Sequence, residues 1–163
     1  MNADPRVMEH FPDPLTLAET DDLIARIQAH FTHHDYGVWA AELRSTGAFI
    51  GFIGLNVPTF EPPFTPHTNP VVEIGWRLAH AHWGNGLATE GASVVLHHAL
   101  TQLNLEEIVS FTVPANIRSR RVMEKLGMHH DPTSDFDHPL LPAAHPLCRH
   151  VLYRIRQKVG AAS

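Results

Sequence analysis

The sequence predicts an α/β fold of the α+β kind, in which helices pack on a mixed β-sheet. Apolar residues alternate over Val71–Ala79, a helical pattern runs from Gly86 to about Leu103, and a further strand over Glu107–Val113 follows. A helix between consecutive strands favours a sheet that contains a parallel pair. The chain has 163 residues, and we expect one domain over 1–163 with its own core.

The N-terminal quarter of the chain predicts helices. Asp4–Phe11 reads as a short helical piece. Thr16–Glu19 has the spacing of a capping box, and the helix that it opens ends near His33 and His34. One face of this helix carries Leu23, Ile27 and Phe31.

A hairpin and a long loop come next. Gly37–Arg44 and Ala48–Asn56 are strand candidates, and the turn Ser45–Gly47 separates them. Val57–Pro70 contains five prolines, which remove backbone donors, so we expect a loop there. The loop is either a lid or binding loop or a stiff surface excursion, and the sequence leaves both open.

The strand at Val71–Ala79 places Glu73 and Arg77 on one face. The opposite face carries the apolar residues Val72, Ile74, Trp76 and Leu78. A turn at His80–Asn85 leads into the helix from Gly86. The inner stripe of that helix consists of Leu87, Ala92, Val95, Leu96, Ala99 and Leu103.

Local signals also define the C-terminal elements. Asn116 is a good N-cap for a helix that reaches Leu126, and Gly127 is placed to end it. Cys148–Ile155 is predicted as a further strand, and residues 158–163 as a frayed tail.

Composition excludes several classes of protein. The net charge of −5 disfavours a nucleic-acid binder and is compatible with a cationic acceptor. The single cysteine, Cys148, excludes an internal disulfide. A polar N-terminus and the lack of an apolar run of about 18 residues predict a cytoplasmic protein without a membrane segment. The 14 histidines are scattered, so no metal site is expected.

The most informative stretch is Glu73–Glu90, where a strand runs into a glycine turn that opens a helix. Free N–H groups at a helix N-terminus, with Gly84 and Gly86 in front of it, form a cradle suited to a pyrophosphate. A tight turn that merely needs glycine would look the same. The turn is neither a P-loop nor the G-x-G-x-x-G fingerprint, because Thr89 stands where the third glycine would fall.

This stretch resembles the acetyl-CoA-binding motif of the GNAT family of N-acetyltransferases, in particular its RimJ/RimL branch. The family pattern Gln/Arg-x-x-Gly-x-Gly/Ala reads Trp83-Gly84-Asn85-Gly86-Leu87-Ala88 here, so Trp83 departs from the broad motif. Two further blocks, Asn116–Met128 and Asp137–Pro139 with Arg149–Tyr153, also resemble the branch. The resemblance covers about residues 4–156 and implies a mixed central sheet flanked by helices.

One departure concerns the start of the domain. The branch usually begins with a strand before its first helix, whereas Met1–Pro5 matches a point inside that helix. We therefore expect a GNAT fold that lacks the usual first strand. The unpaired sheet edge would invite a loop or a second copy of the chain, which makes a homodimer a further expectation.

The resemblance implies a set of site residues. The strand at Ile74–Leu78 would splay from the next strand and pair with the pantetheine arm, and the turn amides would hold the pyrophosphate. The implied cofactor-binding residues are Leu78, Ala79, Trp83, Gly84, Asn85, Gly86, Leu87, Ala88, Thr89, Asn116 and Ser119. Asn116 is either an N-cap alone or also a cofactor contact.

Two residues are candidates for proton transfer. Glu73 is the expected general base for an ammonium acceptor, unless it forms a salt bridge with Arg77. Ser119 is the candidate acid for the leaving thiolate, unless it is an ordinary helical serine. Tyr153 is a fallback acid, for which burial in the strand is the competing interpretation.

Other polar residues are expected to act differently. Glu90 reads as a structural residue at the helix start. One of Arg118, Arg120 and Arg121 could reach the cofactor's 3′-phosphate. Nothing in the sequence pairs Cys148 with an activating base, so we do not expect a thiol nucleophile.

The resemblance implies direct transfer of acetyl from acetyl-CoA to a primary amine in a ternary complex. The acceptor would be a protein N-terminus or a small amine, and a drug or polyamine stays open. The alternative is a non-catalytic acyl-CoA-binding or sensing module.

Overall fold

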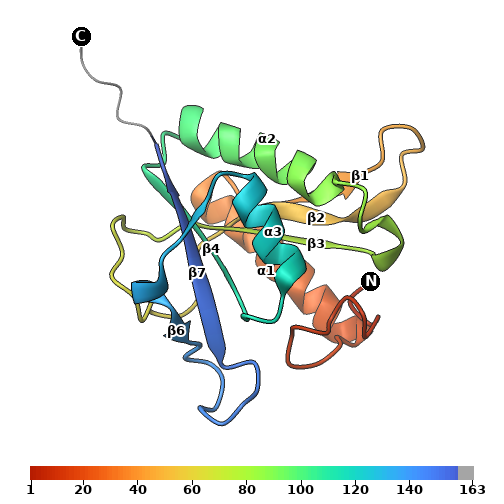
Figure 1. Ribbon diagram of the computed structural model, residues 1–163. Coiled ribbons are helices and arrows are strands. Elements are labelled where there is room, and N and C mark those ends of the chain that lie inside the picture. Colours follow the sequence, from red (N-terminus) through yellow and green to blue (C-terminus); the bar gives the residue numbers. More distant parts are fainter. Residues whose placement is uncertain (158–163) are drawn as a thin grey trace.

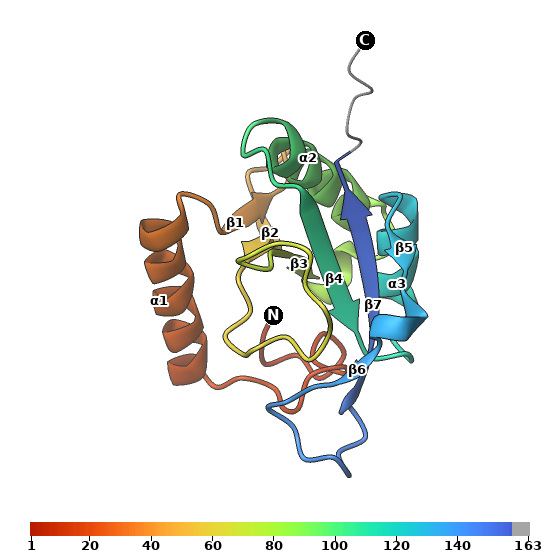
Figure 2. The ribbon, with the colours of Figure 1, turned by 90° about the vertical axis from the view of Figure 1, so that its left-hand side faces the viewer.

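The computed structural model describes residues 1–157 and forms a seven-stranded mixed sheet with helices on both faces (Figures 1 and 2). The strands are β1 (Val38–Glu42), β2 (Phe49–Asn56), β3 (Glu73–Leu78), β4 (Glu107–Thr112), β5 (His129–His130), β6 (Phe136–Asp137) and β7 (Arg149–Arg156). The order across the sheet is β1-β2-β3-β4-β7-β5, and β6 pairs with β7. The predicted mixed α/β architecture is confirmed.

The helices form a layer on each side of the sheet. They are α1 (Leu17–His34), α2 (Leu87–Thr101) and α3 (Ile117–Lys125), with short 3₁₀ turns at His80–His82 and Pro132–Ser134. Figure 2 shows α1 on one face and α2 and α3 on the other. The N-terminal segment and the loop between β2 and β3 share the face of α1.

The first helix begins at the predicted capping box. The Thr16 hydroxyl accepts a hydrogen bond from the Glu19 N–H at 3.2 Å, and the Glu19 carboxylate accepts one from the Thr16 N–H at 2.8 Å. The helix ends at His34, where Asp35 takes a left-handed conformation with a φ of 57°. Its expected inner residues, Leu23, Ile27 and Phe31, are only half-buried.

The predicted helical piece at Asp4–Phe11 is wrong, because the segment forms successive turns. The Asp4 carbonyl accepts from both the Val7 and the Met8 N–H groups, but no regular helix follows. So short a helix is marginal by itself. The segment instead packs on the rest of the molecule, with Val7 and Met8 buried and Phe11 against Arg77.

The hairpin is confirmed, with a shorter first strand than expected. Val38 pairs with Gly54 and Ala41 with Gly51, and the register then shifts between Ala41 and Glu42, which ends the regular pairing. Within the described chain β1 is an edge strand and no strand precedes α1. Pairing of this edge with a second chain stays a prediction.

The proline-rich segment after β2 forms no helix or strand, as predicted. It is held at several points, since the Val57 N–H donates to His30 Nε2 at 3.0 Å and Arg154 donates to the Thr65 carbonyl at 3.2 Å. Phe64 is buried and packs against Phe136. These contacts fit an anchored loop.

The core forms between α2 and the sheet, as the apolar stripes predicted. Ile74 and Leu78 of β3 are buried in one cluster with Ala92, Leu96 and Ala99 of α2. Asn116 caps α3, and Gly127 follows it with a φ of 79°. Gly86 is the N-cap of α2. Both α2 and α3 therefore begin where the local signals in the sequence placed them.

The C-terminal third contains two strands that the sequence did not indicate. β5 and β6 have two residues each, which is too short for an alternating pattern, and both pair with β7. The predicted tail at 158–163 lies outside the described residues. No helix in residues 1–157 has the length and apolar character needed to cross a bilayer.

Candidate functional site

A cleft of about 1180 Å³ passes through the sheet where β3 and β4 part. These parallel strands are in register only at Glu73 and Val109, next to the bond from the Val109 N–H to the Val72 carbonyl. The rest of β3 diverges from β4, so the splay that the resemblance implied is present. The cleft opens toward α2 and α3 on one face and toward α1 on the other.

The cleft wall on the side of α2 is the glycine turn. Gly84 and Gly86 have φ values of 76° and 78°, which a side chain would strain. Gly86 is the N-cap of α2 and supplies no side-chain acceptor, so no side chain caps the first amides of the helix. The turn thus offers backbone donors and the positive end of the helix dipole to an anion.

Trp83 fastens this turn to β3. Its indole N–H donates to the Leu78 carbonyl at 2.8 Å, and the Arg118 guanidinium lies 5.1 Å from the centre of its ring. Asn85 donates from its side chain to the Trp83 carbonyl at 3.1 Å. The indole N–H of Trp83 is therefore used in a hydrogen bond within the protein, and the ring connects the turn with α3 through Arg118.

The structure brings most of the predicted cofactor residues together. Those that line the cleft are Leu78, Trp83, Gly84, Gly86, Leu87, Ala88, Thr89, Asn116 and Ser119. Ala79 and Asn85 lie beside the cleft without lining it. The Ala79 N–H donates to the Ile50 carbonyl at 2.8 Å and is not free for a ligand.

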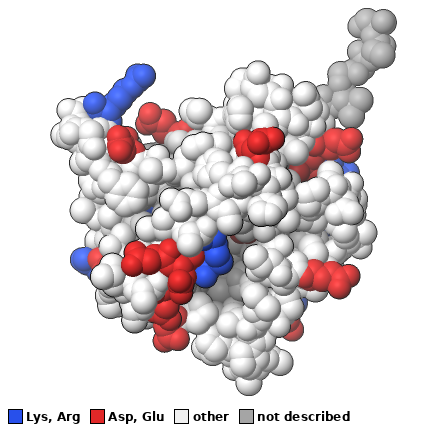
Figure 3. All heavy atoms as spheres, turned by 180° about the vertical axis from the view of Figure 1, so that it is seen from behind, with Lys and Arg blue, Asp and Glu red and all other residues white. Residues whose placement is uncertain are grey.

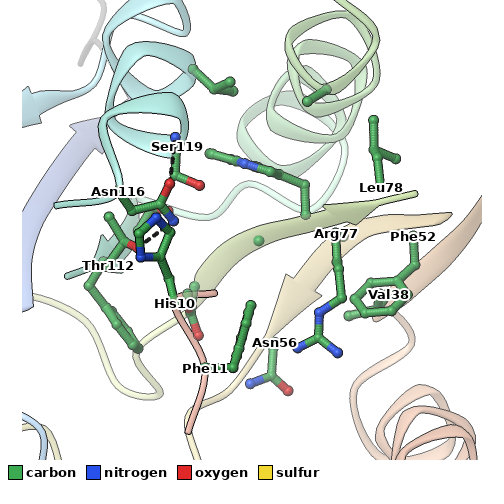
Figure 4. A pocket seen from close by; sticks show the side chains of 18 of the residues that line it. His10, Phe11, Val38, Phe52, Asn56, Arg77, Leu78, Thr112, Asn116 and Ser119 are labelled. Atoms are coloured by element: carbon green, nitrogen blue, oxygen red, sulfur yellow. Dashed lines mark hydrogen bonds between the residues drawn. The ribbon is translucent and has the colours of Figure 1, made fainter. Parts of the chain in front are cut away.

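Asn116 and Ser119 line the cleft at the start of α3 (Figure 4). Asn116 Oδ1 accepts from the Ser119 N–H at 3.2 Å, and Asn116 Nδ2 donates to the Thr112 hydroxyl at 3.0 Å. Asn116 is therefore an N-cap that also ties α3 to the end of β4. The hydroxyl of Ser119 also faces this space in Figure 4.

Glu73 lies at the point of the splay, on the face that points away from α2. Its cross-strand neighbour on β2 is Asn56. Burial raises the pKa of Glu73 to about 8, and the Asn56 side chain opposes part of that rise. The suggested salt bridge with Arg77 is wrong, because none of the ion pairs in residues 1–157 joins the two side chains.

Arg77 instead extends toward the N-terminal segment, which the sequence had not connected with the site. It donates to Asn2 Oδ1 at 3.1 Å, and its guanidinium lies 4.1 Å from the centre of the Phe11 ring. Phe11, Phe52 and Asn56 surround it in Figure 4. The alternation of Glu73, Gly75 and Arg77 along β3 was the only sequence signal that could have placed it here.

The sequence also did not reveal the cleft wall formed by residues of β4 and of the β6–β7 region. Phe111, His138 and His150 line it, and the two imidazole rings are 5.0 Å apart. Burial lowers the pKa of both histidines. His150 lies in β7, which was predicted as a strand, and His138 follows the two-residue β6, which has no pattern of its own. The sequence therefore could not show that the two histidines meet beside β4.

Several candidate residues lie elsewhere. The buried Tyr153 donates to Glu124 at 3.1 Å and accepts from Arg120 at 3.2 Å, so its hydroxyl is used between β7 and α3. Neither Tyr153 nor the buried Cys148 lines the cleft, whereas Arg118 and Arg121 do. In the part of the chain that is described, no three potential ligands gather as a metal site would require.

Comparisons with known proteins agree with this geometry. The family model described as Acetyltransferase (GNAT) domain matches residues 1–129. The uncharacterized protein YkkB of Bacillus subtilis is 31% identical over 130 residues, which are 80% of this chain and 72% of YkkB. A crystal structure of an acetyltransferase from Agrobacterium tumefaciens is 32% identical, with a TM-score of 0.72 over 95% of this chain and 80% of that one.

The narrower resemblance finds less support. The ribosomal-protein-S5-alanine acetyltransferase of Vibrio fischeri has a TM-score of 0.65 over 86% of this chain and 72% of its own, but is only 16% identical. That likeness shows the fold alone, so the RimJ/RimL branch stays an interpretation of the motifs. The family itself is established: the chain belongs to the GNAT acetyltransferases, whose fold uses acetyl-CoA.

Proposed function

We propose that this protein transfers the acetyl group of acetyl-CoA directly to a primary amine, of a small molecule or a protein N-terminus, within a ternary complex. One observation carries the proposal: a single cleft joins the glycine turn to Glu73 through the gap between β3 and β4. A donor held from the side of α2 and an acceptor entering from the side of α1 would meet at this gap.

The residues on the cofactor side suit acetyl-CoA, which supplies an activated thioester. Backbone amides from Gly84 to Thr89 would hold the pyrophosphate, and Arg118 and Arg121 are cations at the same end of the cleft. The unpaired part of β3 would align the pantetheine arm and polarise the thioester carbonyl. The turn thus supports binding mostly through the main chain.

Glu73 would remove the proton from the acceptor. With a pKa of about 8, its carboxyl is mostly neutral at pH 7, and an ammonium group nearby would favour its charged form. The carboxylate first takes a proton from the ammonium, and the neutral amine then attacks the acetyl carbon. The bond to sulfur breaks and the nitrogen loses its second proton to water, while the departing thiolate takes a proton from water, either directly or through the Ser119 hydroxyl, which water then reprotonates.

The test is a thiol-release assay over N-terminal peptides, polyamines, aminoglycosides and small amines. We expect turnover with at least one class, with a rate that rises with pH up to about 8, and a melting temperature that increases with acetyl-CoA. Glu73→Gln should lower kcat at least tenfold and flatten the pH profile, with KM for acetyl-CoA unchanged. The exposed Glu42→Gln is the matched control.

Three outcomes would contradict the proposal in different ways. Absence of any stabilisation by coenzyme A would remove the cofactor site. Binding without thiol release from any amine would favour the non-catalytic module. A normal pH profile in Glu73→Gln would assign the base to another group. The cytoplasmic location expected from the sequence stays a prediction.

A further inference from the structure

A guanidinium group without an acidic partner lies at the end of the cleft that faces α1. Arg77 donates to the neutral side chain of Asn2 and lies against the rings of Phe11 and Phe52, 4.1 and 5.2 Å from their centres. Its Nε is buried and makes no hydrogen bond anywhere in residues 1–157. No carboxylate among those residues forms an ion pair with it.

This arrangement is costly for the folded protein. A buried charge is normally paired, since desolvation penalises the charged form. Burial accordingly lowers the pKa of Arg77 to about 10, with no opposing acidic neighbour. The side chain nevertheless stays charged at neutral pH, so the cleft holds a cation that an anionic ligand could neutralise.

The surface between Arg77 and Glu73 is open. The two residues and Gly75 share one face of β3, and the Cα atoms of residues 73 and 77 are about 13 Å apart in an extended strand. A Cβ placed on Gly75 would meet no atom within 4 Å. Gly75 therefore forms a floor that separates the carboxyl group from the guanidinium.

Glu73, Gly75 and Arg77 are each only partly buried, so this end of the cleft is accessible to solvent. Figure 3 views the molecule from the side opposite to that of Figure 1 and shows a hollow with basic and acidic side chains beside it. The other cleft residues around the floor include Asn56, opposite Glu73, and Phe52, opposite Arg77. The floor thus offers one carboxyl group and one guanidinium, with apolar rings beside the guanidinium.

We infer that the acceptor is a small amine that also carries a carboxylate, bound over Gly75 with its amine toward Glu73 and its carboxylate toward Arg77. This inference rests on the proposed function and names its substrate class. A guanidinium recognises a carboxylate through paired N–H donors, and the interaction strengthens away from water. A polyamine would instead place a second cation near Arg77.

The experiment compares matched acceptors, each amino acid against its own carboxamide, which keeps the amine and loses the negative charge. We expect kcat/KM to be at least tenfold higher for the acid. Arg77→Gln should bring this ratio to about one while KM for acetyl-CoA stays unchanged. Arg77→Lys should keep part of the preference, and the exposed Arg44→Gln should keep all of it.

A binding measurement serves as a second readout. With saturating coenzyme A, calorimetry should detect amino acids more tightly bound than their carboxamides, and this difference should vanish in Arg77→Gln. Gly75→Ala adds a methyl group to the open floor, so it should weaken acceptor binding at least threefold without lowering the melting temperature. This variant tests the floor without removing a charge.

The outcomes separate this inference from the proposed function. Equal kcat/KM for acid and carboxamide, or a preference for polyamines, would overturn the substrate class while acetyl transfer stands. Equal losses for both acceptors in Arg77→Gln, with a lower melting temperature, would assign Arg77 to holding the N-terminal segment. If no amine is acetylated, calorimetry still tests the inference. Equal affinities for the amino acids and their carboxamides would then overturn it without any measurement of activity.

Discussion

Burial shifts the pKa values of two residues on β3, Glu73 and Arg77, in opposite directions. The carboxyl of Glu73 gains affinity for its proton, and the guanidinium of Arg77 loses some of its own. Both shifts favour the uncharged form, because neither group has a partner of opposite charge. Such unpaired groups in a cleft are expected where a ligand supplies the missing charges.

Glu73 should make the stability of the protein depend on pH. Its pKa in the folded state is about 8 against an ordinary value of 4.5, so the folded state keeps the proton where the unfolded state has lost it. Stability from this group is fully present below pH 4.5 and is lost as pH rises to about 8. The loss cannot exceed about 1.4 kcal/mol per pH unit.

Glu73→Gln removes this titration. We expect its free energy of unfolding to exceed that of the natural protein by about 1–3 kcal/mol at pH 8, with a smaller difference at pH 5. Urea unfolding at the two pH values measures the difference directly. Parallel pH dependence of the two proteins would show that the Glu73 carboxyl is ordinary in the folded state.

At the scale of elements, the start of α3 has a structural task and also lies beside the cleft. Asn116 accepts from the Ser119 N–H and donates to Thr112, which fixes the helix to the end of β4. The same residue lines the cleft. Its two interpretations from the sequence are therefore compatible, and substitutions can separate them.

Asn116→Ala should lower the free energy of unfolding by about 1 kcal/mol, the usual cost of a lost N-cap. Asn116→Asp keeps an oxygen for the Ser119 N–H and should retain stability within about 0.5 kcal/mol. Thermal unfolding measures both. If Asn116→Asp is stable but has a several-fold higher KM for acetyl-CoA, the amide also contacts the cofactor; an unchanged KM leaves the cap as its role.

At the scale of the whole molecule, His30 joins three segments of the fold. Its Nε2 accepts from the Val57 N–H at 3.0 Å, and its Nδ1 lies 2.9 Å from the Tyr36 carbonyl. The two backbone partners require a neutral ring with its proton on Nδ1. The ring thereby connects α1 with the start of β1 and with the loop after β2.

Protonation of His30 should weaken this connection. Burial lowers its pKa below the ordinary 6.5, so the unfolded state takes up the proton first and stability is lost as pH falls below 6.5. Between pH 7 and pH 5.5, His30→Gln should therefore lose less free energy of unfolding than the natural protein, by a few tenths to about 1 kcal/mol. The exposed His97→Gln serves as control and should follow the natural protein.

Local signals predicted the fold well because their physical causes are local. A capping box, a glycine that tolerates positive φ and an alternating strand each depend on residues a few positions apart. They placed α1, the glycine turn and the caps of α2 and α3 correctly. The prediction for Asp4–Phe11 failed where the segment packs against residues distant in sequence, such as Phe11 against Arg77.

By itself the sequence determined a mixed sheet flanked by helices, the order of its long elements and the turn formed by Gly84 and Gly86 before α2. Only the tertiary structure decided which polar groups stay unpaired inside the cleft. Arg77 meets Asn2 and Phe11 and not Glu73, and the Trp83 N–H is taken by Leu78. The physical reason is that a charge or hydrogen bond is satisfied by neighbours in space, and folding chooses those neighbours.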